Sequence, residues 1–279
     1  MKKVIVLLVL SLLPFSFLFA GNSFTVSDSA LIVQTALDYG DGFYSGDATR
    51  MERALHPDFN KVSPAKMSEA GNTFLYNSTF SGLIEMTRAK VGFLEEDKRK
   101  EKVTVLKIDG DIGFAKITTA MFNDYLQMVK INDQWKIINV LWTDGEDSPR
   151  KKPLNGFNPE NEKEAIKQAV TDLYEGIFTG DATKIEKSVH NEYNSATLSK
   201  LQNNAFFINK NGFTLIKEVA LSKMQLLEKD KWNLQINILD IMEGLAAVEV
   251  DFTTSINYFQ LAKMDGQWKI INSLKKSLK

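Results

Sequence analysis

Residues 38–49 read DYGDGFYSGDAT, and residues 172–183 read DLYEGIFTGDAT, 134 positions further along the chain. The similarity continues at this offset as far as Asn60 and Asn194, with nine identities in the 23 positions that begin at Asp38. Self-similarity at a fixed offset is the mark of a repeated structural unit. These stretches therefore predict that the chain contains two copies of one fold.

A second pair of stretches closes each copy. Residues 125–139 read YLQMVKINDQWKIIN, and residues 258–272 read YFQLAKMDGQWKIIN. Nine of these 15 positions are identical, and the offset is now 133. Two colinear matches at nearly one offset indicate duplication of a whole domain.

The first half of each copy has helical features. A capping box at Asn161, with Ser27 in the equivalent place, predicts a helix at the start of each copy. Gly46 suits the end of the first of these helices, where a left-handed residue is common. Asp47 or Thr49 then caps a second, shorter helix.

The second half of the first copy has strand features. Short apolar segments are separated by tight-turn dipeptides such as Asp109-Gly110. The expected strands are 103–108, 112–121, 125–131 and 135–142. Strands joined by short turns form an antiparallel meander. Helices followed by a curled antiparallel sheet predict an α+β fold, and such a sheet can enclose an apolar hollow for a ligand.

Several short motifs carry a family resemblance, namely FYSGD at 43–47, ALHPDF at 54–59, GL at 82–83, MT at 86–87 and DYL at 124–126. Together with the QWKI strand they resemble the NTF2-like superfamily, and more narrowly the group labelled putative lumazine-binding. The resemblance covers residues 30–143 well and residues 162–277 less well. It implies tandem NTF2-like, cone-shaped α+β domains, each with a pocket between its helices and a curved antiparallel sheet. Members of the superfamily include isomerases, dehydratases, cyclases and pure binding modules.

The chain divides into four expected segments. Residues 1–20 combine Lys2 and Lys3, an apolar run and a terminal Ala20, which is typical of a secretory signal peptide. The first domain is expected at 21–145, a linker rich in proline and charge at 146–161, and the second domain at 162–279. This order predicts a periplasmic or secreted protein that has no membrane contact after signal cleavage.

Composition excludes several classes of function. The formal net charge is -1, so no basic surface for nucleic acid is expected. The chain contains no Cys, which excludes thiol catalysis and zinc–thiolate sites. Its two His residues fall in separate copies and no metal-binding spacing occurs, so neither a metal nor another cofactor is expected.

Ten residues are candidates for a site. His56 and Asp58 are the catalytic candidates, since a His beside a carboxylate can handle protons. The alternative is that His56 caps a helix end and that Asp58 is an exposed loop residue. Eight residues are expected to bind a flat ligand by stacking or hydrogen bonding, and the alternative is that they pack in the core. They are Tyr39, Phe43, Phe59, Tyr125, Tyr174, His190, Tyr193 and Tyr258.

Three functions remain open on this basis. The first is an exported module that binds a small apolar or aromatic molecule. The second is an enzyme of the dehydratase or isomerase kind, with His56 or Asp58 as the base and Tyr125 as the hydrogen-bond donor. The third is a structural adaptor of the cell envelope, which would expose an apolar patch. The absence of a complete catalytic set favours the binding module.

The two copies are expected to pair within the chain. NTF2-like domains commonly dimerise through their sheets, and a linker raises the effective concentration of one copy near the other. The strands 135–142 and 268–274 are the expected contact surfaces of this intrachain pseudo-dimer. Trp142 is opposite in phase to Trp135, so we expect it to meet the partner copy, and Lys275 in its place makes the interface asymmetric.

Overall fold

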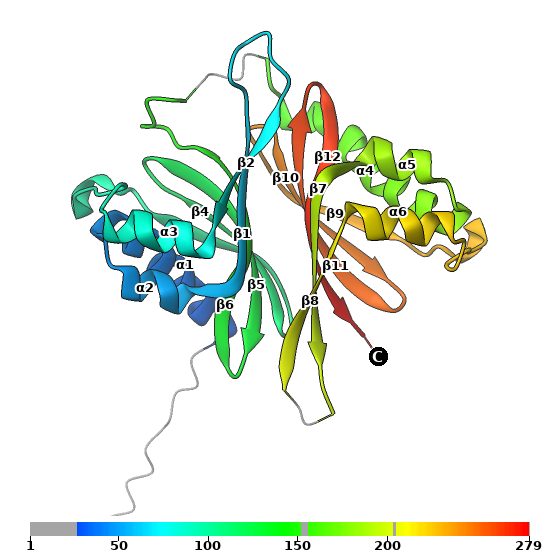
Figure 1. Cartoon of the computed structure of the whole chain (residues 1–279), viewed down its shortest axis with the longest axis horizontal. Coiled ribbons are helices and arrows are strands. Elements are labelled where there is room, and N and C mark those ends of the chain that lie inside the picture. The colour runs from blue at the N-terminus through cyan, green and yellow to red at the C-terminus, as the bar shows by residue number, and fades with distance from the viewer. Residues whose placement is uncertain (1–26, 152–155, 203–204, 279) are drawn as a thin grey trace, which may run out of the picture.

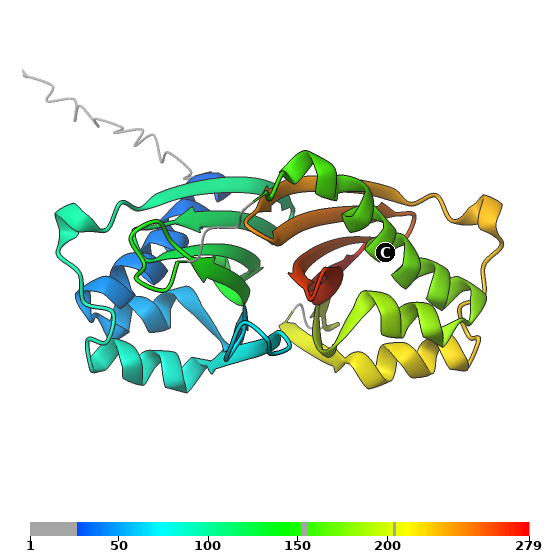
Figure 2. The same ribbon diagram turned by 90° about the horizontal axis from the view of Figure 1, so that it is seen from above.

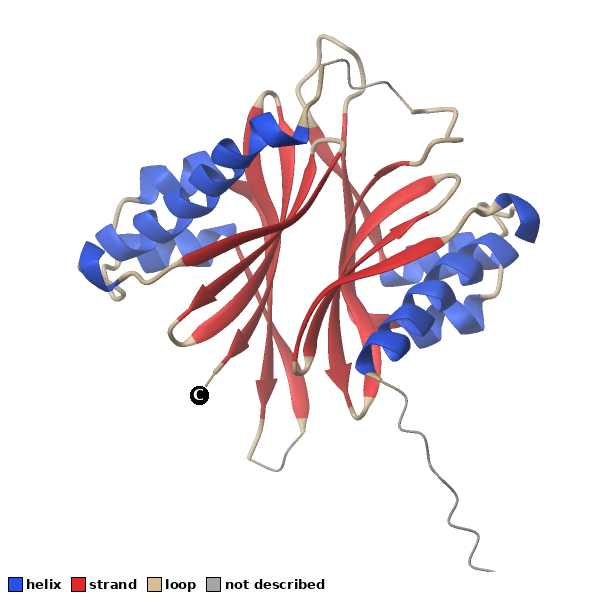
Figure 3. Ribbon diagram, turned by 180° about the vertical axis from the view of Figure 1, so that it is seen from behind, coloured by secondary structure: helices blue, strands red, loops and turns tan. Residues whose placement is uncertain are grey.

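The computed structural model describes residues 27–151, 156–202 and 205–278. It contains two similar α+β units whose sheets face each other at the centre of the molecule (Figure 1). The helices of each unit lie on the outer side of its sheet (Figure 3). The α+β class and the tandem arrangement are therefore confirmed. The expected signal peptide, residues 1–20, lies outside the described residues.

Each unit has the same order of elements. The first unit consists of α1 (Asp28–Ser45), α2 (Ala48–Ala54), β1 (Leu55–Ala65), β2 (Phe74–Thr79), α3 (Phe80–Arg88), β3 (Lys102–Asp109), β4 (Ile112–Thr118), β5 (Phe122–Ile131) and β6 (Gln134–Asp144). The second consists of α4 (Pro159–Thr179), α5 (Ala182–Ser188), β7 (Val189–Lys200), β8 (Phe206–Gly212), α6 (Phe213–Leu221), β9 (Gln235–Met242), β10 (Leu245–Phe252), β11 (Ser255–Met264) and β12 (Gln267–Ser277). A short 3₁₀ turn precedes β3 and another precedes β9.

The sheets extend beyond the predicted meander. Their strand orders are β2-β1-β6-β5-β4-β3 and β8-β7-β12-β11-β10-β9. The meander from β3 to β6 is antiparallel, as expected, whereas β1 pairs in parallel with β6. Neither β1 nor β2 is among the strands predicted from the sequence. Their hairpin with α3 closes the open side of the curved sheet.

The repeated glycines and aspartates have local structural roles. Gly46 has φ 75°, accessible to glycine without strain, and ends α1 as predicted. The Asp47 side chain accepts a hydrogen bond from the backbone N–H of Arg50 and caps α2. A Cβ on Gly42 would lie 3.0 Å from the backbone nitrogen of Met51, so glycine lets α1 and α2 approach closely.

One helix starts earlier than expected. The N-cap of α4 is Asn158, whose side chain accepts from the backbone N–H of Glu160, and not Asn161. Pro159 occupies the first helical position, where its fixed φ and missing N–H cost nothing. The last residues of the segment expected as linker therefore belong to the helix.

A β-bulge in β6 changes which side chains face the helices. Gln127 pairs with Asn139 and the next residue, Met128, pairs with Ile137, so Ile138 is an extra residue. Beyond the bulge the alternation is inverted, and Trp142 joins Trp135 in the core between helices and sheet. The expectation that Trp142 meets the partner copy is wrong for this reason.

The two sheets pack face to face through a shared apolar layer. This layer takes side chains from both units, among them Ile138, Leu141, Ile271 and Leu274 of the two closing strands. The closing strands thus contribute to the contact, as expected, and β3, β4, β9 and β10 contribute as well. Figure 2 shows β3 and β9 running side by side at one edge of this interface.

Polar side chains form a symmetric network inside this layer. Asn60 donates to Asn272 Oδ1 at 3.1 Å, and Asn194 donates to Asn139 Oδ1 at 2.7 Å. Each of Asn139 and Asn272 donates in turn to the Gln of its own unit, and that Gln donates to a backbone carbonyl of the other unit. Because buried polar groups need partners, this network fixes how the two sheets register.

The described helices include none that is long and apolar enough to cross a membrane.

Candidate functional site

The first unit contains a cavity of about 390 Å³ between its helices and the concave face of its sheet. Its walls are mainly apolar and aromatic, and they include Phe43, Leu83, Met86, Phe122 and Trp142. Such a volume and lining are typical of a small-molecule site. The cavity exists because α1 and α3 cover the curved sheet without filling the space between them.

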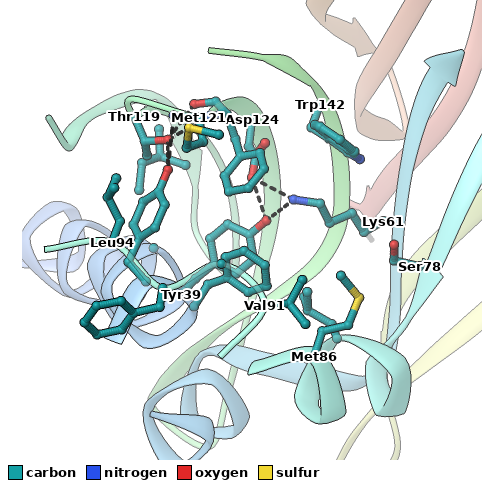
Figure 4. A pocket seen from close by; sticks show the side chains of 18 of the residues that line it. Tyr39, Lys61, Ser78, Met86, Val91, Leu94, Thr119, Met121, Asp124 and Trp142 are labelled. Atoms are coloured by element: carbon teal, nitrogen blue, oxygen red, sulfur yellow. Dashed lines mark hydrogen bonds and ion pairs between the residues drawn. The ribbon is translucent and has the colours of Figure 1, made fainter. Parts of the chain in front are cut away.

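Three polar side chains meet at one side of this cavity, which we name the polar cluster: Tyr39, Lys61 and Asp124. Tyr39 donates its hydroxyl proton to Asp124 Oδ2 at 2.5 Å. Lys61 Nζ lies 3.1 Å from the same oxygen and also donates to the Tyr39 hydroxyl. Figure 4 shows Lys61 reaching between Tyr39 and Asp124, with Trp142 above it.

Burial determines the protonation behaviour of the polar cluster. Lys61 is 7% exposed, and burial lowers the pKa of its ammonium group although the Asp124 carboxylate opposes the shift. Burial, followed by the charge of Asp124, raises the pKa of Tyr39 far above its ordinary value. The Lys61 ammonium also lies 4.9 Å from the centre of the Trp142 ring, within cation–π distance. A buried charge needs such partners, and the cluster as a whole carries no net charge.

Two buried polar atoms beside the cavity have no hydrogen-bond partner among the described residues. They are Asp124 Oδ1, an acceptor, and Trp142 Nε1, a donor. A buried polar group without a partner costs about 1–3 kcal/mol. Both residues line the cavity, so each keeps unused hydrogen-bonding capacity next to the space that a ligand would occupy.

The second unit has a cavity of about 430 Å³ in the equivalent place, with a different lining. The repeat offset puts Leu173, Ser195 and Asn257 at the positions of Tyr39, Lys61 and Asp124. The Tyr193 hydroxyl lies 2.6 Å from Ser273 Oγ, and Ser273 donates to Ser195 at 3.0 Å. The second cavity therefore has neutral hydroxyl and amide groups where the first has a buried ion pair.

Comparison with known proteins identifies the family. The family model described as putative lumazine-binding matches residues 27–143 and again residues 161–274. The chain belongs to this putative lumazine-binding family. No curated protein matches the chain.

Three solved structures that are similar to this chain each cover less than half of it. An NTF2-like protein of unknown function from Shewanella baltica OS155 is 14% identical, covers 44% of this chain and 99% of its own length, and has a TM-score of 0.36. A second from Silicibacter pomeroyi DSS-3 is 17% identical over 43% of this chain and 99% of its own, with a TM-score of 0.35. A ketosteroid isomerase-like protein from Erwinia carotovora atroseptica is 15% identical over 44% and 99%, with a TM-score of 0.30.

The structure brings four of the expected ligand-binding residues to the cavities of this family member. Tyr39 and Phe43 line the first cavity, and Tyr174 and Tyr193 line the second. Phe59 lies in the core between helices and sheet and is not among the lining residues.

His56 and His190 lie at the starts of β1 and β7 and line neither cavity. The Nδ1 atom of His56 accepts a hydrogen bond from the backbone N–H of Asp58 at 3.1 Å, and His190 does the same with Glu192. Burial lowers the pKa of both imidazoles, which keeps them neutral acceptors. They hold the irregular first residues of these strands. The exposed Asp58 carboxylate adjoins His56 and does not line the cavity either.

Tyr125 and Tyr258 point into the interface between the sheets. The Tyr125 hydroxyl donates to Asp240 Oδ2 at 2.6 Å, and the Tyr258 hydroxyl donates to Asp109 Oδ2 at 2.5 Å. Each tyrosine therefore binds a carboxylate of the other unit. The expectation that they contact a ligand fails because both strands place these side chains on the convex face of their sheets, away from the cavities.

Sequence reasoning missed Lys61 and Asp124. Lys61 lies on β1, a strand that was not predicted, so its orientation toward the concave face was unknown. Asp124 directly precedes Tyr125 in a quoted motif, and strand alternation puts the two on opposite faces. The one feature of the sequence that could have indicated Asp124 as a site residue is its carboxylate within an otherwise apolar strand. Among the described residues no group of three or more His, Asp or Glu side chains is arranged to hold a metal ion.

Proposed function

We propose that the chain is an exported binding protein and that its first unit holds a small, flat, neutral molecule with an apolar body and a polar edge. The observation that carries this proposal is the polar cluster at one side of an otherwise aromatic cavity. An aromatic wall favours a flat ring, and the unused atoms of Asp124 and Trp142 favour a ligand edge that offers both a donor and an acceptor.

A neutral ligand fits the electrostatics best. Lys61 and Asp124 neutralise each other, and Arg150, the other charged residue of the lining, is paired with Asp144. A charged ligand would therefore be desolvated without an unpaired counter-charge. Heteroaromatic compounds of the lumazine kind have the required shape and edge, and the family description makes lumazine the first compound to test.

An enzymatic role is less well supported. A dehydratase or isomerase needs a free base and a donor in the same cavity. His56, Asp58 and Tyr125, the residues expected to act together, do not meet in a cavity.

The adaptor role is the second candidate, supported by exposed apolar side chains at the end of α6 and in the loop after it. Leu221, Met224 and Leu226 are 49%, 81% and 54% exposed. Replacing Met224 and Leu226 by Gln should release the protein from its own host's envelope fraction without changing ligand affinity if this role holds. Unchanged fractionation would remove it.

Export rests on the sequence of residues 1–20. We expect the protein isolated from its host's periplasm or medium to begin at Gly21. Intact-mass measurement of that protein tests this, and a retained Met1 would contradict export with cleavage.

The binding proposal is tested with a double variant that gives the first cavity the polar residues of the second. Lys61→Ser with Asp124→Asn removes both charges together, which avoids leaving one buried charge alone. We expect affinity for lumazine, or for the compound that copurifies from the host, to fall about 10- to 100-fold. Quenching of tryptophan fluorescence and titration calorimetry measure this loss.

The matched control is Ser195→Ala in the second cavity, which should leave that affinity unchanged. If the double variant binds as tightly as the wild-type protein, or if neither lumazine nor a copurifying compound binds the wild-type protein, the proposal is wrong.

A further inference from the structure

Two ion pairs join strands of the two sheets across their interface, while two further pairs between the units, Lys66–Asp265 and Lys151–Glu243, join loops. Lys107 Nζ on β3 lies 3.0 Å from Glu249 Oε1 on β10, and Lys116 Nζ on β4 lies 2.7 Å from Asp240 Oδ2 on β9. Both lysines belong to the first unit and both carboxylates to the second. In these two pairs the first unit therefore supplies only positive charges and the second unit only negative charges.

The four residues occupy only two distinct positions of the repeated fold. Asp240 follows Lys107 by 133 residues, and Glu249 follows Lys116 by the same interval. The strand registers agree, since Lys116 pairs with Thr104 and Glu249 pairs with Asn237, which occupies the position of Thr104 in the second unit. The bulges in β3 and β9 also coincide at Leu106 and Leu239. The two ion pairs therefore join the same two positions of the repeated fold, and the approximate two-fold axis of the pseudo-dimer relates one pair to the other.

We propose that these four charges make the pairing selective, so that each sheet face recognises the other kind of unit and rejects a second copy of its own kind. In a pair of first units the same geometry would bring Lys107 against Lys116 twice. In a pair of second units it would bring Asp240 against Glu249 twice. Like charges placed opposite each other across an interface disfavour the wrong partner.

Burial makes these charges effective. The side chains of Glu249, Lys116 and Asp240 are 6%, 21% and 24% exposed, so water and salt screen them only partly, whereas Lys107 is 39% exposed and is screened more. Asp240 also accepts a hydrogen bond from the Tyr125 hydroxyl of the first unit, which ties its carboxylate to the interface. A rearrangement that moves the Asp240 carboxylate away from Lys116 would also break its hydrogen bond with Tyr125.

The Asn and Gln network of the interface does not discriminate between the two kinds of unit. The network of Asn60, Asn139, Asn194 and Asn272 uses the same residue type at equivalent positions of both units, and so do Gln127 and Gln260. Two identical units would satisfy this network equally well. Selectivity between units therefore falls to contacts that use different residues in the two units, foremost these four charges and the Tyr125–Asp240 hydrogen bond.

Three variants of the full-length chain test the proposal. Lys107→Glu with Lys116→Glu puts four carboxylates at the interface, and Asp240→Lys with Glu249→Lys puts four lysines there. The third variant combines all four changes. It again pairs opposite charges, with the carboxylates now on the first unit and the lysines on the second. Thermal unfolding gives the midpoint Tm, and small-angle X-ray scattering gives the radius of gyration, both at about 50 mM and 500 mM salt.

We expect each of the first two variants to lose about 5 °C or more in Tm and to increase in radius of gyration at low salt, with part of the loss recovered at high salt. The four-change variant should regain at least half of the lost Tm and the wild-type radius. Far-UV circular dichroism checks that each variant folds.

The proposal is overturned if the like-charge variants match the wild-type protein in Tm and radius. It is equally overturned if the four-change variant, whose charges are complementary again, is no better than the like-charge variants. This test does not depend on ligand binding, so it stands apart from the function of the first cavity.

Discussion

At the scale of single residues, Lys61 determines the character of the first cavity. Its ammonium group is buried with Asp124 and Tyr39 and replaces the water that both polar partners would otherwise bind. Breaking a buried ion pair on one side leaves a charge without compensation, whereas removing both charges is often tolerated. The polar cluster should therefore behave as one unit in stability measurements.

We expect Lys61→Met to lower the free energy of unfolding by about 3 kcal/mol, because the Asp124 carboxylate loses its counter-charge. Adding Asp124→Asn to this variant should recover most of the loss. Urea denaturation of the two variants and the wild-type protein measures both effects. Equal stability of the single and double variants would show that the two charges are not coupled.

Glu101 supplies a second test at this scale. Burial, together with the adjacent Asp41 carboxyl, raises the pKa of Glu101 to about 8. Above the ordinary pKa of 4.5 the unfolded chain releases this proton, while the folded chain retains it up to about pH 8. The folded state then binds more protons than the unfolded state, so the free energy of unfolding decreases as the pH rises through this window.

Glu101→Gln removes this titration. We expect the variant to have a flatter dependence of stability on pH between about pH 5 and pH 8 than the wild-type protein. Urea denaturation at intervals of one pH unit gives the two slopes. Identical slopes would mean that Glu101 ionises in the folded chain near its ordinary pKa.

At the scale of secondary-structure elements, the sequence predicts those parts whose signals are local. Gly46 and Asp47 mark a helix end and a helix start, and the Asp109-Gly110 dipeptide marks a tight turn, because each depends on a few neighbouring residues. β1 was missed because its partner β6 lies about 80 residues away and because a helix leads directly into it. Lys61 was missed along with this strand.

The bulge at Ile138 has a similar cause. Strict alternation along 135–142 puts Trp135 and Trp142 on opposite faces, and one extra residue reverses this result. A bulge depends on the pairing with β5, which a single strand does not reveal.

Four of the eight expected ligand-binding residues reach a cavity, while Tyr125 and Tyr258 lie on the other face of the sheet.

The close contact of α1 with α2 gives a prediction at this scale. Gly42→Ala would place a methyl group 3.0 Å from the backbone nitrogen of Met51 and 3.3 Å from the Asp47 carbonyl oxygen, so the two helices must separate. We expect a loss of about 1–3 kcal/mol in the free energy of unfolding. Thermal or urea denaturation measures it.

Gly82→Ala is the matched control, because its methyl group would lie within 4 Å of only Thr79 Oγ1 at 3.2 Å, and α3 accommodates alanine. This control should change stability by less than about 1 kcal/mol. If the two alanine variants are equally stable, the close approach of α1 and α2 does not explain the glycine at position 42.

At the scale of the whole molecule, duplication has produced two units that share one fold and differ in particular polar residues. Both supply the same Asn and Gln network to the interface, and they differ in the charges of the interface and in the polar lining of their cavities. The buried ion pair is present in the first unit and is replaced by Ser195 and Asn257 in the second. The polar cluster of the first cavity therefore has no counterpart in the second unit.

With the proposed function of the first cavity, this difference between the cavities predicts the stoichiometry of binding. Native mass spectrometry of the full-length protein, carrying the compound that copurifies from its host or saturated with lumazine, counts ligand molecules per chain. We predict one molecule per chain in the wild-type protein and in Ser195→Ala, and none in the variant that combines Lys61→Ser with Asp124→Asn. Two molecules per chain, or one molecule that survives the loss of Lys61 and Asp124, would contradict the assignment of the first cavity as the binding site.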